Sequence, residues 1–190
     1  LVSSSAASDV YKRQAEKVQK SVEFGNHFNN AWWFEPACLG HYPEAGLKTY
    51  AEHMPEFPDS DFNTIKQPMD FVGLNIYQGG VVKAGADGEP EHVPHAVGHP
   101  ITCFDWPVTP AALRWGPYWA HKHFDLPVVI TENGLASMDW VGLDGRVRDG
   151  QRIDFTRQYL LELEKAIADG TEVCLLYASP SPRDRYISRM

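Results

Sequence analysis

One glutamate in this sequence, Glu132, follows directly on a short apolar segment and is well placed for chemistry. Residues 126–131 are short, β-branched and uncharged, and Asn133 and Gly134 follow the glutamate. Such a segment predicts a strand buried on both faces, and α/β folds place catalytic groups at the carboxyl ends of these strands. A carboxylate there is costly to desolvate without partners, which favours a functional role. From the spacing alone, a glutamate that only caps a helix or lies in a loop explains the pattern equally well.

Asn75 and Tyr77 form a second pair of candidate site residues, at the end of the apolar segment 71–77. Positions i and i+2 of a strand point to the same face, so the amide and the hydroxyl would face one site. For a tyrosine alone, packing at the edge of a core is the more common outcome. The pair therefore supports a site only if the two apolar segments lie side by side.

Predicted helices alternate with the two predicted strands. Apolar spacing predicts a helix over 15–30, and Thr109-Pro110 is a typical helix start for a segment running toward Phe124, with Gly116-Pro117 as a kink or break. A third helix would follow Asp149 and end at Gly170, with an apolar stripe at Ile153, Leu160, Leu163 and Ile167. Helix, strand, helix, strand, helix with buried strands predicts a parallel α/β arrangement.

Composition excludes several classes of function. A net charge of −8 without a basic stripe argues against nucleic acid and anionic membranes as partners, and no run approaches the ~20 apolar residues of a membrane span. Cys38 and Cys103 are too far apart in sequence to suggest a disulfide framework, so a reducing, cytoplasmic location is the expected default. The histidines at 92, 95 and 99 lie among prolines and glycines, which predicts a solvated loop and no metal site. The sequence makes no prediction of oligomeric state.

Both ends of the chain look foreign to the rest of it. Back-translation of residues 4–14 fits a DNA sequence that resembles a transposon end used in sequencing-library preparation, and residues 174–184 fit the reverse strand of the companion adapter. Such segments are kept out of fold reasoning. We therefore expect non-native flanks at 1–14 and 174–190 around one native segment, residues 15–173.

Four segments of this sequence resemble segments of glycoside hydrolase family 1, in the family's order. They are Trp33–Pro43 (WFEPACLGHYP), Phe71–Tyr77 (FVGLNIY), Ile130–Gly134 (ITENG) and Asp149–Glu172. The matching family patterns for the first three are WFxxPxxxGxYP, DFxGxNYY and [IV]TENG. A lone TENG would be a weak signal, whereas four ordered segments over nearly all of 15–173 are specific. Ile76 stands where the family has the first tyrosine of NYY.

The resemblance implies a partial (β/α)₈ TIM barrel, running from the helix after strand five through strands six and seven to the helix after strand seven. The family's acid/base glutamate lies in an Asn-Glu-Pro motif after strand four, and this sequence contains no such motif. We therefore expect the chain by itself to be inactive.

By the same resemblance, Glu132 is the catalytic nucleophile and Tyr77 orients it. Asn75 lines the same subsite, and Trp106 resembles a tryptophan on the aglycone side. The implied activity is that of a retaining β-glycosidase, which removes terminal β-linked glucose from short β-glucosides or oligosaccharides by double displacement and without a cofactor. Two alternatives stay open: a 6-phospho-β-glycosidase, and a non-catalytic sugar-binding relative that lacks the acid/base glutamate.

Overall fold

A computed structural model of the chain describes residues 30–86 and 90–176. Within these ranges the chain forms two compact units, which are described separately. The first unit comprises the residues up to 68 together with 80–94, and the second comprises 69–79 together with the residues from 95 onward. The expected flank 1–14, residues 15–29 of the first predicted helix, and residues 177–190 lie outside the described part of the chain.

The first unit consists of short helices and one hairpin. Its elements are α2 (Trp32–Cys38), α3 (Glu44–Tyr50), η2 (Ala51–His53), η3 (Asp59–Asp61), α4 (Phe62–Ile65), and the antiparallel pair β2 (Val82–Ala84) and β3 (Pro90–His92). Aromatic rings connect these helices, because Trp32 packs against Tyr42, which in turn contacts Phe62. Helix α3 and the 3-10 turn η2 follow one another directly over residues 44–53.

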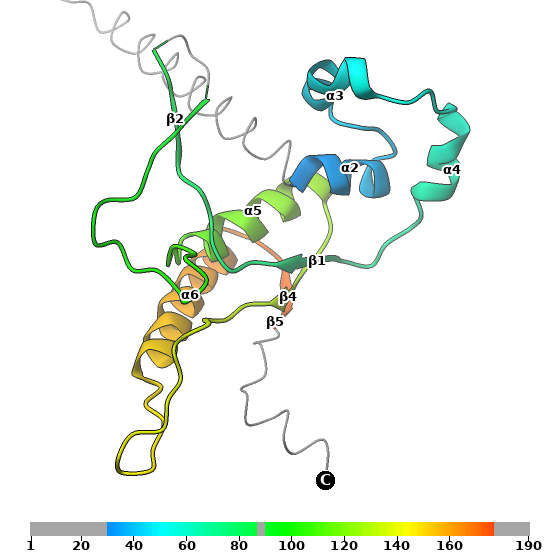
Figure 1. Ribbon diagram of the computed structural model, residues 1–190. Helices are drawn as coiled ribbons and strands as arrows, with labels where there is room; N and C mark the ends of the chain where they lie inside the picture. The colour runs from blue at the N-terminus through cyan, green and yellow to red at the C-terminus, as the bar shows by residue number, and fades with distance from the viewer. Residues whose placement is uncertain (1–29, 87–89, 177–190) are drawn as a thin grey trace, which may run out of the picture. The chain divides into compact units, whose positions relative to one another are not determined.

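Three parallel strands form the centre of the second unit. They are β1 (Val72–Asn75), β4 (Val128–Glu132) and β5 (Val173–Leu176), in the order β1-β4-β5 (Figure 1). The register pairs Leu74 with Ile130 and then Asn75 with Glu132, so Thr131 is an extra residue on β4 at this point. The predicted parallel arrangement of the two buried segments is confirmed.

Helix α5 (Ala112–Phe124) packs against α6 and β4. A kink or a break was predicted at Gly116-Pro117; the helix is continuous through this pair, so the break is wrong, and the kink stays a prediction. The Pro117 ring is buried, and its burial offsets the backbone hydrogen bond that proline cannot donate. Asp125 ends the helix in the left-handed conformation, with its N–H bonded to the His121 carbonyl.

Helix α6 (Gly150–Ala168) packs against α5 through a face that the sequence did not predict. The buried residues are Phe155, Tyr159, Leu163 and Ala166. Of the predicted stripe, Leu163 is buried, whereas Ile153 is 67% exposed, Leu160 42% and Ile167 52%. Gly170, with φ +85°, follows the helix end, where the Thr171 N–H bonds the Ala166 carbonyl. The predicted stop at Gly170 is therefore confirmed.

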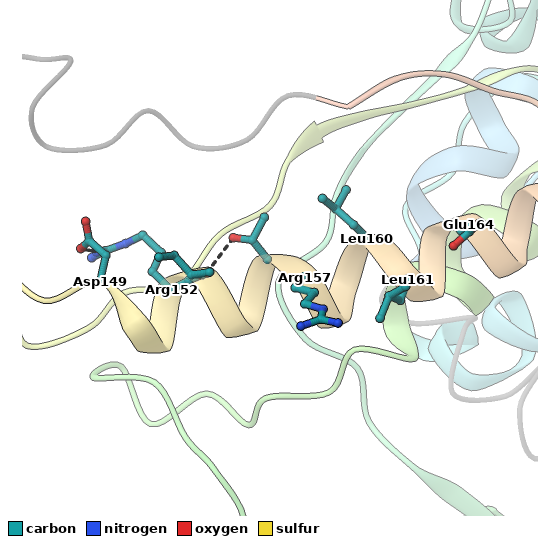
Figure 2. A pocket seen from close by; sticks show the side chains of 8 residues that line it. Asp149, Arg152, Arg157, Leu160, Leu161 and Glu164 are labelled. Carbon is teal, nitrogen blue, oxygen red and sulfur yellow. Dashed lines mark hydrogen bonds and ion pairs between the residues drawn. The ribbon is translucent and has the colours of Figure 1, made fainter.

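The outer face of α6 carries exposed apolar side chains between charged ones. A shallow hollow of about 610 Å³ lies along it, and Figure 2 shows Leu160 and Leu161 there, with Arg157 and Glu164 beside them. None of the helices in the described ranges has the length and apolar character needed to cross a membrane. Strand β5 spans the flank boundary expected between 173 and 174, and that boundary stays a prediction.

Candidate active site

Tyr77 and Glu132 meet at the carboxyl ends of two neighbouring parallel strands. Glu132 is the last residue of β4, and Tyr77 lies two residues beyond the end of β1. The Tyr77 hydroxyl donates a hydrogen bond of 2.5 Å to Glu132 Oε2. Next to it, the Ile76 N–H donates to the Glu132 carbonyl at 2.9 Å. The phenol donor leaves the second carboxylate oxygen of Glu132 without this contact and restrains the orientation of the group.

Asn75 lies beside Glu132 in the strand register, but its side chain bonds another residue. The Thr131 hydroxyl donates to Asn75 Oδ1 at 2.6 Å. The extra residue on β4 brings this about, because it places Thr131 between the pairs Leu74–Ile130 and Asn75–Glu132. The structure thus joins Tyr77 to Glu132, and Asn75 to Thr131.

Trp106 lies against Tyr77 and remains 37% exposed. The two ring centroids are 5.5 Å apart with the rings tilted by 54°. A tight turn presents this tryptophan: the Thr102 hydroxyl accepts the N–H groups of Phe104 at 3.2 Å and Trp106 at 3.3 Å. The Thr102 N–H donates to the Trp106 carbonyl at 2.8 Å, which closes the turn. Trp106 therefore offers an aromatic surface next to the Tyr77–Glu132 pair.

Asn133 is a supporting residue to which the sequence analysis gave no role. Its side chain is buried, and Nδ2 donates to the Ile76 carbonyl at 2.8 Å. This bond ties the residue after Glu132 to the residue before Tyr77. The available signal in the sequence was an amide side chain directly after a candidate catalytic carboxylate. Such a side chain requires a hydrogen-bond partner where it is buried.

Arg152 fixes the segment that leads from β4 into α6. Its guanidinium bonds Asp149 at 2.5 Å, Asp139 at 2.8 Å and the Ser137 hydroxyl at 3.1 Å. Figure 2 shows Arg152 and Asp149 at the start of the helix. Hydrogen bonds from Arg152 and, to a smaller extent, from Ser137 lower the pKa of Asp139 below its usual value. Asp149, at the N-cap position of α6, thus serves as an ion-pair partner and makes no side-chain cap hydrogen bond.

A second hollow, of about 960 Å³, lies between the segment 99–108, the segment 135–148 and α6. Glu132 and Tyr77 are not among its lining residues, whereas Ser137, Asp139 and Phe155 are. Within the described ranges, no group of three or more His, Cys, Asp or Glu side chains is arranged to hold a metal ion. The Tyr77–Glu132 pair itself offers a carboxylate with a phenol donor.

Comparison with known proteins gives consistent results. The pattern of the family described as "Glycosyl hydrolase family 1" matches residues 2–186. Beta-glucosidase A of Thermotoga maritima is 35% identical over 159 residues, which cover 83% of this chain and 36% of that protein. The aryl-phospho-beta-D-glucosidase BglC of Bacillus subtilis is 31% identical over 181 residues, which cover 80% of this chain and 37% of that protein.

Solved structures agree with the sequence relatives. The beta-glucosidase from Thermotoga maritima in complex with castanospermine superposes with a TM-score of 0.73 at 34% identity, over 84% of this chain and 36% of that one. The chain thus spans little more than a third of the length of these relatives. The partial α/β barrel predicted from the resemblance is confirmed, and the chain belongs to glycosyl hydrolase family 1.

Proposed function

We propose that the protein to which this chain contributes is a retaining β-glycosidase, with Glu132 as its nucleophile. The observation that carries the proposal is the 2.5 Å hydrogen bond from the Tyr77 hydroxyl to Glu132 Oε2 at the carboxyl ends of adjacent parallel strands. In barrels of this class, catalytic side chains lie at this end of the strands. Beta-glucosidases among the relatives support glucose as the sugar.

Double displacement gives Glu132 a defined task. Its carboxylate oxygen attacks the anomeric carbon, the bond from that carbon to the aglycone oxygen breaks, and the aglycone takes a proton from a general acid elsewhere in the protein. Water then attacks the same carbon and gives a proton to the deprotonated acid, the glycosyl ester breaks, and the Glu132 carboxylate is regenerated. The acid must lie about 5–5.5 Å from Glu132 for this route, and the Asn-Glu-Pro motif that would carry it does not occur in this sequence.

Tyr77 supports the nucleophile in two ways. Its hydroxyl donates to one carboxylate oxygen, which holds the group in one orientation and balances negative charge on that oxygen. The other oxygen, Oε1, can then approach the sugar. We assign Tyr77 as the residue that orients Glu132.

Asn75 and Trp106 are proposed to contact the sugar and the aglycone. Because Asn75 Oδ1 accepts a hydrogen bond from Thr131, its amide NH₂ group is the part that can donate to a sugar hydroxyl. The Trp106 ring is part-exposed beside Tyr77, which suits stacking of a ring next to the reacting centre. A small β-glucoside or oligosaccharide is the proposed substrate.

A 6-phospho-β-glycosidase is the second candidate, and the relatives provide the reason. The aryl-phospho-beta-D-glucosidase BglC of Bacillus subtilis, at 31% identity, lies close in similarity to the beta-glucosidases. Parallel assays of the full-length protein with an aryl β-glucoside and its 6-phosphorylated form separate the two. A kcat/KM higher for the phosphorylated substrate would replace our proposal with the second candidate.

The test of the nucleophile is Glu132→Ala in the full-length protein, assayed with an aryl β-glucoside that has a good leaving group. We expect turnover to fall to background with the circular dichroism spectrum unchanged. Added azide should then restore turnover and give the α-glucosyl azide, because the small anion attacks from the side that the carboxylate occupied. A β-azide would show that Glu132 acts as the acid/base, and undiminished turnover without azide would exclude a catalytic role. A wild-type protein that binds glucosides without hydrolysing them would be the non-catalytic relative.

A further inference from the structure

Tyr159 is a buried tyrosine in the middle of α6 with two hydrogen-bond partners. Its hydroxyl accepts the Thr109 N–H at 2.9 Å and donates to the Tyr77 carbonyl at 2.8 Å. The ring is fully buried and stacks on Phe155, with centroids 3.9 Å apart and planes at 21°. Burial raises the pKa of Tyr159, so the phenol keeps the proton that it donates to Tyr77.

The Tyr77 carbonyl lies outside the ladder of hydrogen bonds between the strands. Strand β1 ends at Asn75, so Tyr77 is two residues beyond the end of that strand. A backbone carbonyl that is removed from water without a partner destabilises the conformation that buries it. The hydroxyl of Tyr159 supplies that partner from a helix that lies more than eighty residues further along the sequence.

Two further hydrogen bonds hold the same segment. The Gly79 N–H donates to the Thr109 hydroxyl at 2.8 Å, and Asn133 Nδ2 donates to the Ile76 carbonyl at 2.8 Å. Gly79 also comes close to α5, since a Cβ at this position would lie 3.0 Å from the Ala112 Cβ. The backbone on both sides of Tyr77 is therefore fixed, and Tyr159 fixes the carbonyl of Tyr77 itself.

We infer that Tyr159 is a positioning residue for the Tyr77–Glu132 pair: by holding the Tyr77 carbonyl, it sets the Tyr77 hydroxyl on the Glu132 carboxylate. The inference rests on the proposed function, in which this carboxylate is the nucleophile. A hydrogen bond of 2.5 Å tolerates little displacement, and a shift of about 1 Å in a catalytic group reduces rates by up to ~10²-fold. A side chain remote from the sugar can thereby control the reaction.

The test is a double-mutant cycle between Tyr159→Phe and Tyr77→Phe in the full-length protein, with an aryl β-glucoside as substrate. We expect Tyr159→Phe to lower kcat/KM about ten-fold. The loss should fall on kcat with KM little changed, as for Tyr77→Phe, because both changes displace the nucleophile and leave the contacts to the sugar in place. In the Tyr77→Phe background, Tyr159→Phe should have less than about a two-fold further effect, since coupled residues are not additive.

Tyr118→Phe is the matched control, because Tyr118 lies on α5 and its ring contacts Trp115 and Lys122. It removes the same hydroxyl group and should leave kcat and KM unchanged. Equal losses from Tyr159→Phe in both backgrounds, or a loss that falls on KM alone, would overturn the inference. They would leave the proposed function intact, since that depends on Glu132→Ala and the azide product.

Thr109→Val covers the case in which Tyr159→Phe does not fold. It removes the hydroxyl that accepts the Gly79 N–H and keeps the Thr109 N–H for Tyr159. We expect about a three-fold loss of kcat/KM that again disappears in the Tyr77→Phe background. The inference requires that the backbone around Tyr77 sets the position of the Tyr77 hydroxyl, so an additive loss in this second cycle would overturn it.

Discussion

Two apolar residues on the outer face of α6 are exposed in this chain. We predict that replacing them has opposite effects on the 190-residue chain and on the full-length protein. Ile153 and Leu160 are 67% and 42% exposed in this chain and line the hollow shown in Figure 2. In a complete (β/α)₈ barrel, each outer helix lies between two neighbouring helices, so this face should be covered there. Replacing both residues with lysine should therefore improve the solubility of the 190-residue chain and destabilise the full-length protein.

The size of the effect follows from the exposed fractions. Full burial of a leucine or isoleucine side chain contributes about 1.5–3 kcal/mol. Ile153 is 67% exposed in this chain and Leu160 is 42% exposed. Covering the exposed part in the complete barrel would contribute about 1–2 kcal/mol for Ile153 and about 1 kcal/mol for Leu160. The double variant should thus lose about 2–3 kcal/mol in the full-length protein, and the cost of burying two charges adds to this.

Thermal unfolding of the full-length variants measures the loss, and sedimentation of the purified 190-residue chain measures its solubility. Gln158→Lys is the control, because it adds a positive charge on the same helix at an exposed position away from the hollow in Figure 2. It should change neither measurement. Unchanged stability of the full-length double variant would refute the reasoning, since it would mean that this face of α6 stays in water in the whole protein.

Three further predictions concern the site and the segment behind it. The 190-residue chain alone should show no measurable turnover of an aryl β-glucoside, whereas the full-length protein should turn it over in the same assay. Tyr77→Phe should lower kcat/KM by about 10–100-fold in steady-state kinetics, because a hydrogen bond to a charged group contributes about 1.5–3 kcal/mol; a change below two-fold would contradict the proposed role. Because Arg152 lowers the pKa of Asp139 in the folded state, the stability from this carboxylate is present above pH 3.8 and is lost as the pH falls through the lowered value. The difference in thermal midpoint between the wild-type protein and Asp139→Asn should accordingly shrink in acid, and a difference independent of pH would count against the pairing.

The sequence predicted the strands and the candidate carboxylate because both follow from local patterns. The segments that became β1 and β4 are apolar and β-branched, and Glu132 follows directly, so their placement needed no information from distant residues. The prediction of the buried face of α6 was wrong because that face depends on contacts with distant segments. The helix has two apolar stripes, one through Tyr159 and Leu163 and one through Ile153 and Leu160, and periodicity alone does not say which of them packs against α5.

Details of the site depended on contacts between distant segments. The partner of Asn75 is Thr131 because of a one-residue irregularity in the strand register, and no sequence pattern marks that position. Tyr159 was not part of the predicted apolar stripe, although its ring is buried and its hydroxyl bonds Tyr77, which lies 82 residues earlier. The expected roles of Glu132, Tyr77, Asn75 and Trp106, the flank boundaries and a cytoplasmic location stay predictions.

The three-stranded sheet of the second unit has β1 and β5 as its outer strands. Each outer strand has backbone N–H and C=O groups along one side that another strand can pair with. A barrel made in two pieces could therefore reassemble without a covalent link, through the same ladder hydrogen bonds that join β1 to β4. Mixing this chain with a separately expressed remainder of the barrel should then regain β-glucosidase activity, and the rate of recovery would report how fast two open sheet edges find each other.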